Sequence, residues 1–314
     1  MKRNNKTLYR IIPFYELVQM CEEPRKMILK SPRLWDDNYE GFFYRKLMTI
    51  EGLTEAYNFI LELFNSKDPD LFAEGNDVSF SINILSKEEK TLFFILRCII
   101  TYYLVFCISF TEDEKESDAM WRIYSFDKTS LKVEFDKKKL ESLKEIFFLN
   151  VDYDDNFDFL KELKETITTR DKKKNLRLFK PLYKKRMAFQ HENEVRMVYY
   201  HMLQAIPIIG IQQHPDHNSA EKNELLSKSK NCFDENKNFL PEQFLNMISN
   251  YLEKFKKETT AEIDLTKENL LTKDLIKSVV VHPQSAEYYV KIIEKYCNRH
   301  KINFKSKSKL YDFE

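Results

Sequence analysis

The chain has 314 residues, 43% of them hydrophobic and 14% aromatic, which is enough for a sizeable core and excludes a disordered polymer. Its only glycines are Gly41, Gly52, Gly75 and Gly210, too widely spaced for the phosphate-cradling loop of a P-loop or a dinucleotide fingerprint. A net charge of +1 supplies no overall field toward nucleic acid or a membrane surface.

The first half of the chain alternates between short strand-like runs and longer runs with helical spacing. Pro13 closes the first run, which favours an edge strand there, and Ser86 with Glu89 forms a capping box at a helix start. The expected strands are 9–12, 28–30, 104–110, 131–135 and 146–151, the expected helices are 15–21, 44–65, 87–103, 118–124 and 157–168, and 34–40 is an ordered loop.

The second half is interrupted by a polar, aperiodic stretch. The expected strands are 194–200, 206–211, 275–281 and 302–311, the expected helices are 241–255 and 285–300, and the polar stretch is 212–238. Helices and strands interleave without a steady βαβ rhythm or an internal repeat. We therefore expect a single α+β domain over 1–314, with a mixed central sheet flanked by helices and a polar, partly helical insertion at about 212–260.

Several features indicate a cytoplasmic protein without a membrane segment. The five cysteines are odd in number and scattered, with no CxxC motif, as is typical of a reducing compartment. No apolar signal core follows the basic start. Arg97 interrupts the most hydrophobic stretch, 92–110, which favours a buried helix running into a buried strand.

Residues 192–196 carry the most informative charge pattern. On a strand, Glu192, Glu194 and Arg196 would share one face, about 7 Å apart, while Val195 and Met197 anchor the other face in the core. Such a row could hold a ribose hydroxyl, bind a metal or act as a general base. The strand alone favours the simpler alternative, an ion-paired ladder on a solvent face.

Other polar and aromatic residues are candidates for a site. The segment 35–40 could bind a metal or substrate, although the segment alone favours a self-capped turn. Ser109 ends an apolar strand and needs a polar partner. Trp121 and Tyr124 share a helical face, as either core or a ligand platform. Cys107 is expected to be buried and inert.

A series of short motifs runs in a defined order along the chain. They are Leu8-Tyr9-Arg10, Ser31-Pro32, Trp35-Asp36-Asp37-Asn38-Tyr39-Glu40, Val105-Phe106-Cys107-Ile108-Ser109-Phe110, Met120-Trp121-Arg122-Ile123-Tyr124, Val133-Glu134-Phe135, Phe189-Gln190-His191-Glu192-Asn193-Glu194-Val195-Arg196, Val279-Val280-Val281-His282-Pro283 and Lys307-Ser308-Lys309-Leu310-Tyr311. In this order they resemble a bacterial family catalogued as domain of unknown function 2971, over nearly the whole chain except 212–260. That resemblance implies no agreed activity.

The layout is also similar to that of ADP-ribosyltransferases, which have an early-strand arginine, a middle-strand serine and a late Glu-x-Glu strand. The resemblance implies an ADP-ribosyltransferase-like fold with NAD as co-substrate. It implies that Glu194 stabilises an oxocarbenium-like transition state and Glu192 directs the acceptor. The implied NAD-binding residues are Arg10, Tyr9, Ser109, Trp121 and Tyr124, and the implied substrate-contacting or orienting residues are Ser31, Asp37, Glu40 and Arg196.

The favoured expectation is thus an NAD-dependent ADP-ribosyltransferase or NAD-glycohydrolase acting as a bacterial toxin or phage-defence effector. Its acceptor would be nucleic acid or protein, its partner an antitoxin or another defence component, and no metal would be needed. Two alternatives stay open. One is a metal-dependent nuclease using Asp36, Asp37, Glu192 and Glu194, and the other is a non-catalytic binding module. A single cleft lined by Arg10, Ser109 and Glu194 would favour the first, and a metal-sized gap among the carboxylates the second.

Overall fold

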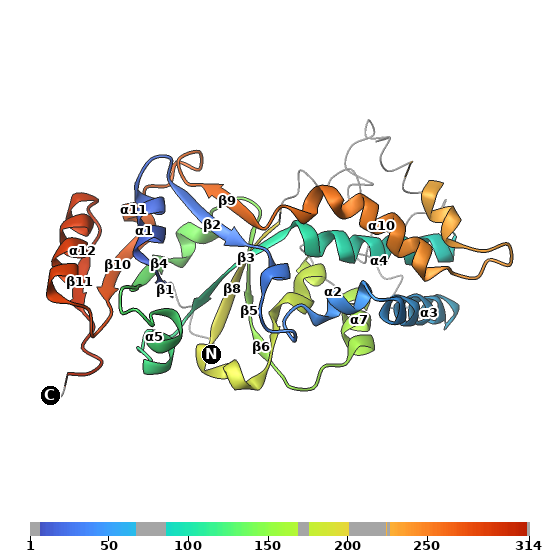
Figure 1. Ribbon diagram of the computed structural model, residues 1–314, viewed down its shortest axis with the longest axis horizontal. Coiled ribbons are helices and arrows are strands. Elements are labelled where there is room, and N and C mark those ends of the chain that lie inside the picture. The colour runs from blue at the N-terminus through green and yellow to red at the C-terminus, as the bar shows by residue number, and fades with distance from the viewer. Residues whose placement is uncertain (1–6, 67–85, 169–175, 201–223, 225–226, 313–314) are drawn as a thin grey trace.

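The computed structural model describes residues 7–66, 86–168, 176–200, 224 and 227–312, and it is an α+β protein built around a mixed nine-stranded sheet (Figure 1). Strands β10 and β11 pair in parallel, and the other pairings of this sheet are antiparallel. Its strands are β1 (Thr7–Ile12), β2 (Lys26–Lys30), β3 (Val105–Thr111), β4 (Leu131–Asp136), β5 (Ile146–Asn150), β8 (Glu194–Tyr200), β9 (Thr260–Asp264), β10 (Ile276–Val281) and β11 (Phe304–Lys307). The prediction of an α+β fold with a mixed central sheet is therefore confirmed, and the ADP-ribosyltransferase-like arrangement of that fold stays a prediction.

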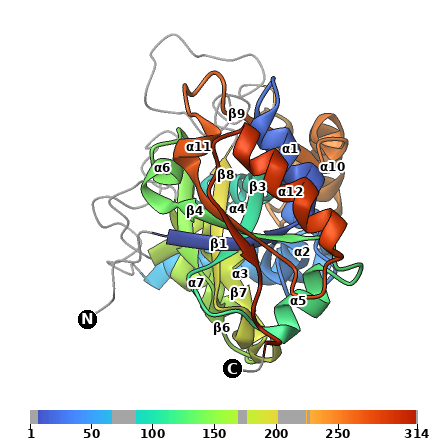
Figure 2. The same ribbon diagram turned by 90° about the vertical axis from the view of Figure 1, so that its left-hand side faces the viewer.

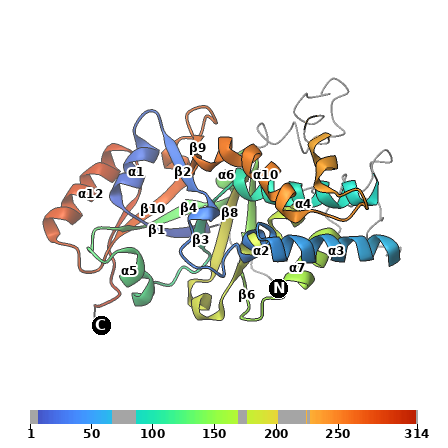
Figure 3. The ribbon, with the colours of Figure 1, turned by 45° about the vertical axis from the view of Figure 1, so that its right-hand side comes forward.

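Helices cover the sheet in two groups. Figures 1 and 3 show α2, α3, α4, α7 and α10 gathered at one end, and Figure 2 shows α1 and α12 side by side at the other. The α-helices are α1 (Phe14–Cys21), α2 (Phe42–Leu47), α3 (Ile50–Ser66), α4 (Lys87–Leu104), α5 (Asp118–Tyr124), α6 (Lys137–Glu141), α7 (Phe159–Thr168), α10 (Pro241–Lys256), α11 (Thr272–Leu275) and α12 (Glu287–Arg299). The short elements are β6 (Asp152–Tyr153), β7 (Lys184–Lys185) and the 3₁₀ turns η1 (Pro32–Leu34), η3 (Leu176–Tyr183), η4 (Met187–Glu192) and η5 (Lys230–Cys232).

Each helix group encloses its own hydrophobic core, and β3 separates the two. Because side chains alternate along a strand, Val105 and Cys107 face the core beneath α2, α3, α4, α7 and α10, while Phe106 and Ile108 face the core shared with α1 and α12. The described residues include no helix that is long and apolar enough to cross a membrane. The hydrophobic stretch at 92–110 is instead α4 followed by β3, as predicted.

The edge of β3 opposite β8 is open in its middle. Strand β8 pairs along one whole edge of β3, from Val105 to Thr111. The other edge meets β1 only at Thr111, opposite Tyr9, and β2 only at Cys107, opposite Lys30. Strands β1 and β2 therefore diverge on the same side of β3, and the residues between 107 and 111 face the space between them.

Three predictions about local structure were wrong. The first strand is not at an edge, because β1 pairs with β4 along its whole length and with β3 at one end. The expected helix 44–65 is two helices, broken after Leu47. Glu192 belongs to η4 and not to the strand that follows it. The expected strand at 206–211, and most of the polar stretch from 212, lie outside the described residues.

The helix break depends on Thr49 and Gly52. The Thr49 hydroxyl accepts a hydrogen bond from the Gly52 N–H at 3.1 Å, so that Thr49 caps the start of α3. A Cβ atom on Gly52 would lie only 2.2 Å from the Lys46 carbonyl oxygen. A glycine is therefore needed where the end of α2 passes close to α3.

We expect Gly52→Ala to lower the free energy of unfolding by about 1–3 kcal/mol, because the new methyl group must push the two backbones apart. Urea denaturation measures the change. Glu51→Ala, at the exposed neighbouring position, is the matched control and should stay within about 0.5 kcal/mol of the wild type. Equal stability of the two variants would contradict the close approach.

Candidate functional site

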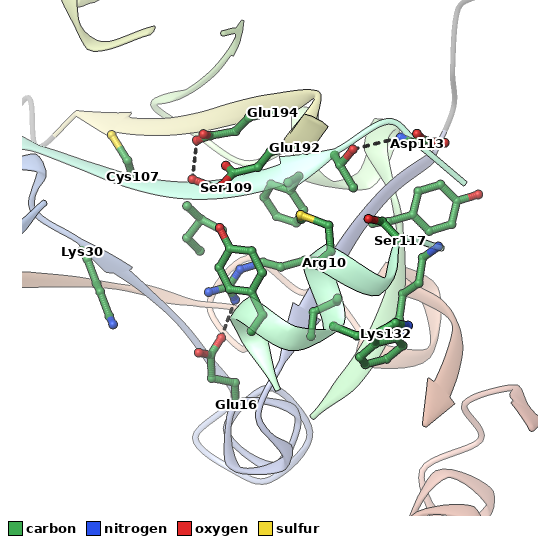
Figure 4. Close-up of a pocket in the computed structure, with 18 of the residues that line it drawn as sticks. Arg10, Glu16, Lys30, Cys107, Ser109, Asp113, Ser117, Lys132, Glu192 and Glu194 are labelled. Atoms are coloured by element: carbon green, nitrogen blue, oxygen red, sulfur yellow. Dashed lines mark hydrogen bonds and ion pairs between the residues drawn. The ribbon is translucent and has the colours of Figure 1, made fainter. Parts of the chain in front are cut away.

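A cavity of about 310 Å³ occupies the opening between β1 and β2 (Figure 4). Its walls come from β1, β2, the middle of β3, helix α5 and the junction of η4 with β8. All seven residues predicted to be catalytic or NAD-binding line this cavity: Tyr9, Arg10, Ser109, Trp121, Tyr124, Glu192 and Glu194. Residues far apart in the sequence are thus brought together where the sheet is left unpaired.

Along β8, Glu194 and Arg196 lie on the same face as Val198, which packs in the core beneath α2, α3, α4, α7 and α10. Val195 and Met197 lie on the opposite face, in the core shared with α1 and α12. Glu192 lies close to them from the end of η4, and not from the strand as predicted. Asn193 has a φ of 42°, a left-handed conformation that asparagine tolerates, and it links η4 to the strand.

The row does not lie on a solvent face, which was the alternative that the strand pattern alone favoured. The exposed fractions of Glu192, Glu194 and Arg196 are only 6%, 4% and 1%. Charged side chains are rarely this buried unless they are paired. Their partners therefore decide what the site can do.

Glu194 is held on both carboxylate oxygens. Oε1 accepts hydrogen bonds from the Ser109 hydroxyl and from Arg196 Nε, the latter at 2.8 Å, and Oε2 accepts one from Lys185 Nζ at 3.0 Å. Burial alone would raise the pKa of Glu194, but Arg196, Lys185 and the Ser109 hydrogen bond together hold it at about 2. Glu194 is therefore an ionised carboxylate in a fixed orientation at neutral pH.

Arg196 links Glu194 to a second buried carboxylate. Its Nη2 lies 2.9 Å from Glu40 Oε2, its Nη1 donates to the Leu182 carbonyl, and its guanidinium sits 4.3 Å from the centre of the Trp35 ring. Burial raises the pKa of Glu40, against the opposing effect of Arg196 and Lys185. Arg196 thus contacts Glu194 directly, and Glu40 contacts Arg196, so both lie behind Glu194 as seen from the cavity.

Lys185 is the main residue that sequence reasoning missed. It belongs to a basic run, and such runs are usually solvated, yet its exposed fraction is 6%. Its Nζ lies 2.6 Å from Glu192 Oε2 and 3.4 Å from Glu40 Oε1, in addition to the contact with Glu194. Tyr153, the partner of Lys185 in strand β6, also contributes to the site, since its hydroxyl accepts a hydrogen bond from the Glu194 N–H at 2.8 Å. Residues 184–186 are all basic, so their types carry no signal that the middle side chain is the buried one.

Cations lie across the cavity from the two glutamates (Figure 4). Arg10 forms an ion pair with Glu16, and both side chains line the cavity. Lys132 Nζ donates to the Glu114 carbonyl and lies 4.8 Å from the centre of the Tyr9 ring, and burial lowers the pKa of Lys132. The cavity therefore has Glu192 and Glu194 on one side and two cations, each with carboxylates near it, on the other.

The two aromatic residues of α5 play different parts. Trp121 is buried, donates from Nε1 to Glu116 at 3.1 Å and meets the His282 ring edge-on, so it forms a fixed wall. Tyr124 is 42% exposed, while burial of its hydroxyl, followed by the effect of Glu192, raises its pKa to about 12. Tyr124 can therefore contact both a bound ligand and solvent.

None of the four predicted substrate-contacting or orienting residues lines the cavity, and two of them, Ser31 and Asp37, do not contact Glu194 or Arg196 either. The Ser31 hydroxyl accepts from Arg33 Nε at 3.0 Å at the start of η1, which is a local structural role. Asp37 accepts from Arg186 Nε at 3.1 Å and from the Tyr39 N–H at 2.9 Å, as in a self-capped turn. Cys107 does line the cavity, but burial raises the pKa of its thiol to about 12, consistent with the inert cysteine expected.

The carboxylates do not surround a gap suited to a metal. Within the described part of the chain, no three His, Cys, Asp or Glu side chains are arranged to hold a metal ion. Glu192 and Glu194 converge on the Lys185 ammonium, and Asp37 turns to Arg186 instead. The arrangement that would favour the nuclease is therefore not found among these residues.

Comparison with known proteins identifies part of the chain. The family described as protein of unknown function (DUF2971) matches residues 120–197, a span that runs from α5 into β8. It includes Trp121, Tyr124, Glu192 and Glu194 of the cavity lining. No curated protein and no solved structure matches the chain. The resemblance to this family is confirmed for residues 120–197, where the chain contains a DUF2971 family domain, and the match does not extend over nearly the whole chain as expected.

Proposed function

We propose that this protein cleaves NAD between nicotinamide and ribose and transfers the ADP-ribosyl group to an acceptor or to water. The observation that carries the proposal is the meeting of Arg10, Ser109 and Glu194 in one cavity, with Glu194 buried, ionised and fixed. These three residues come from three different strands, and the opening along β3 is what lets them face the same space.

The reaction calls for a carboxylate of this kind. As the bond from ribose C1′ to the nicotinamide nitrogen breaks, its electron pair leaves with nicotinamide and positive charge builds on C1′ and the ring oxygen. A carboxylate that is already oriented stabilises that charge without reorganising. A carboxylate has about four acceptor positions, and the described contacts of Glu194 use three, so one remains for a ribose hydroxyl.

The distribution of charge in the cavity suits NAD. The two phosphates would lie toward Arg10 and Lys132, and the cationic nicotinamide riboside toward Glu192 and Glu194. The volume of about 310 Å³ is at the lower end of the range of ~300–1,000 Å³ for small-molecule sites, enough for one half of the dinucleotide. The other half would extend past Tyr124 at the mouth.

Glu192 is the residue proposed to direct the acceptor. An attacking hydroxyl, amine or water loses a proton as it bonds to C1′, and a second carboxylate on the same wall can accept that proton. A nucleic-acid or protein acceptor gives an ADP-ribosyltransferase, and water gives an NAD-glycohydrolase. The role as a toxin or phage-defence effector, with an antitoxin or defence partner, rests on the sequence resemblance alone.

The test is incubation of the purified protein with NAD labelled in the nicotinamide or in the adenylate half, with and without cell extract. We expect nicotinamide to be released, and the adenylate label to appear either on macromolecules of the extract or in free ADP-ribose. Label on nucleic acid or on protein identifies the acceptor class. Binding of NAD without cleavage would favour the non-catalytic binding module, and neither binding nor cleavage would refute NAD chemistry.

A further inference from the structure

The Lys185 ammonium lies between three buried carboxylates, of which Glu192 and Glu194 are close together in the chain and Glu40 is distant. Its Nζ is 2.6 Å from Glu192, 3.0 Å from Glu194 and 3.4 Å from Glu40. An ammonium group has three N–H donors, so each carboxylate can receive one. The ring of Phe189 lies 4.9 Å from the same nitrogen and covers the ammonium on another side.

The backbone of Lys185 is fixed independently of these ion pairs. Strand β7 pairs in parallel with β6, which sets Lys185 beside Tyr153, and the Lys185 carbonyl accepts the Asp154 N–H at 3.0 Å. The Tyr153 hydroxyl in turn accepts a hydrogen bond from the Glu194 N–H. The small sheet of β6 and β7 therefore holds both the lysine and the start of β8.

The charge balance shows what Lys185 must do. Three carboxylates (Glu40, Glu192, Glu194) and two cations (Lys185, Arg196) give a net charge of −1 in this buried cluster. Without Lys185 the charge would be −2, with only Arg196 to offset it. Like charges in such a place repel one another or take up protons, and either outcome would remove the fixed, ionised pair from the cavity wall.

We propose that Lys185 is the positioning residue of this site, which holds the Glu192 and Glu194 carboxylates at a fixed separation facing the cavity. It acts through the two glutamates and does not itself line the cavity. The inference rests on the proposed function only for its catalytic consequence, because the arrangement of the carboxylates is a property of the unliganded protein.

The titration of Glu194 reports this role. The titratable and charged groups that face it are Lys185 from β7, Glu192 from η4, Arg196 from β8, Glu40 ahead of α2, Tyr153 from β6, Tyr124 from α5 and Cys107 from β3. An opposite charge within hydrogen-bond distance typically lowers a carboxyl pKa by about one to three units. Lys185→Met keeps the aliphatic stem and removes that charge.

The experiment follows the Glu194 carboxyl carbon by NMR from pH 2 to 8 in protein labelled on glutamate, with Glu194→Gln to assign the signal. We expect a midpoint in Lys185→Met that is about one to three pH units higher than in the wild type. Lys185→Arg should restore the wild-type behaviour. Lys184→Met is the matched control, since the adjacent lysine pairs with Asp152 and Glu162 outside the cavity.

A Glu194 midpoint in Lys185→Met that equals the wild-type midpoint would overturn the proposal. If Lys185→Met does not fold, Lys185→Met/Glu192→Gln restores the net charge of −1 and should recover folding, and a failure to do so would count equally against it. In the catalytic assay, the acid limb of the pH profile of kcat should move to higher pH in Lys185→Met. A merely structural loss would instead lower kcat by the same factor at every pH. The NMR titration uses no NAD, so it stays decisive even if NAD cleavage is refuted.

Discussion

Glu194→Gln is expected to reduce NAD cleavage by about 10²–10³-fold, the effect typical of removing one preorganised electrostatic contact to a transition state. The amide has nearly the same shape but no negative charge to oppose the charge that develops on ribose. Its NH₂ group would also face donors, because Ser109, Arg196 and Lys185 all give hydrogen bonds to this side chain. Nicotinamide release at saturating NAD measures the loss as a change in kcat.

The control for this variant is Glu262→Gln, the same substitution on a glutamate that pairs with Lys26 at the surface, which should leave kcat unchanged. Circular dichroism of both variants establishes that each is folded at the assay temperature. Because the charge acts on the transition state, KM should change much less than kcat in Glu194→Gln. A kcat within about threefold of the wild type in folded protein would remove Glu194 from the chemical step.

Strand alternation predicted the central part of the site correctly. The expected strand 194–200 coincides with β8, and Val195 and Met197 are in the core as the pattern required. The same pattern could not show that the face with Glu194 and Arg196 is buried. Burial of that face depends on η3 and on the segment before α2, which supply Leu182 and Glu40 from distant parts of the chain.

The failures at Glu192 and Lys185 have related causes. Because Asn193 is left-handed, the strand begins at Glu194, two residues later than the alternation suggests, and no periodicity reveals such a conformation at one asparagine. A lysine in a basic run is normally solvated, and only the convergence of three carboxylates makes its burial favourable. Both features depend on tertiary contacts, which a pattern within one segment does not contain.

The open edge of β3 explains why the predicted ligand-binding residues meet. If β1 and β2 had continued along β3, Ser109 would face a neighbouring strand and the cavity would not exist. Pro13 and the turn before β2 separate these strands, so β1 touches β3 at one end and β2 touches it near the other. The unpaired middle of β3 is then available to a ligand, with Arg10 on one side and Glu194 on the other.

Arg196→Met is expected to lower the free energy of unfolding by about 3–5 kcal/mol at pH 7, the range found when one partner of a buried ion pair is removed. Arg196 is 1% exposed and is bonded to Glu194, Glu40 and the Leu182 carbonyl, so the substitution leaves two buried carboxylates with Lys185 as their remaining cation. Urea denaturation measures the loss. Arg122→Met is the control, because its pair with Asp118 is at the surface and should contribute less than about 1 kcal/mol.

The pH dependence distinguishes loss of this charge from loss of packing. The pKa of Glu194 in the folded protein, about 2, is below its ordinary value of 4.5, so its ion pairs stabilise the wild type fully above pH 4.5 and lose that effect as the pH falls toward 2. In Arg196→Met the carboxylate accepts a proton more readily, which relieves the buried charge. The stability difference between wild type and variant should therefore shrink as the pH falls below 4.5. If the stability difference between wild type and variant stays constant from pH 7 to pH 3, the loss comes instead from the contact of the Arg196 side chain with Trp35.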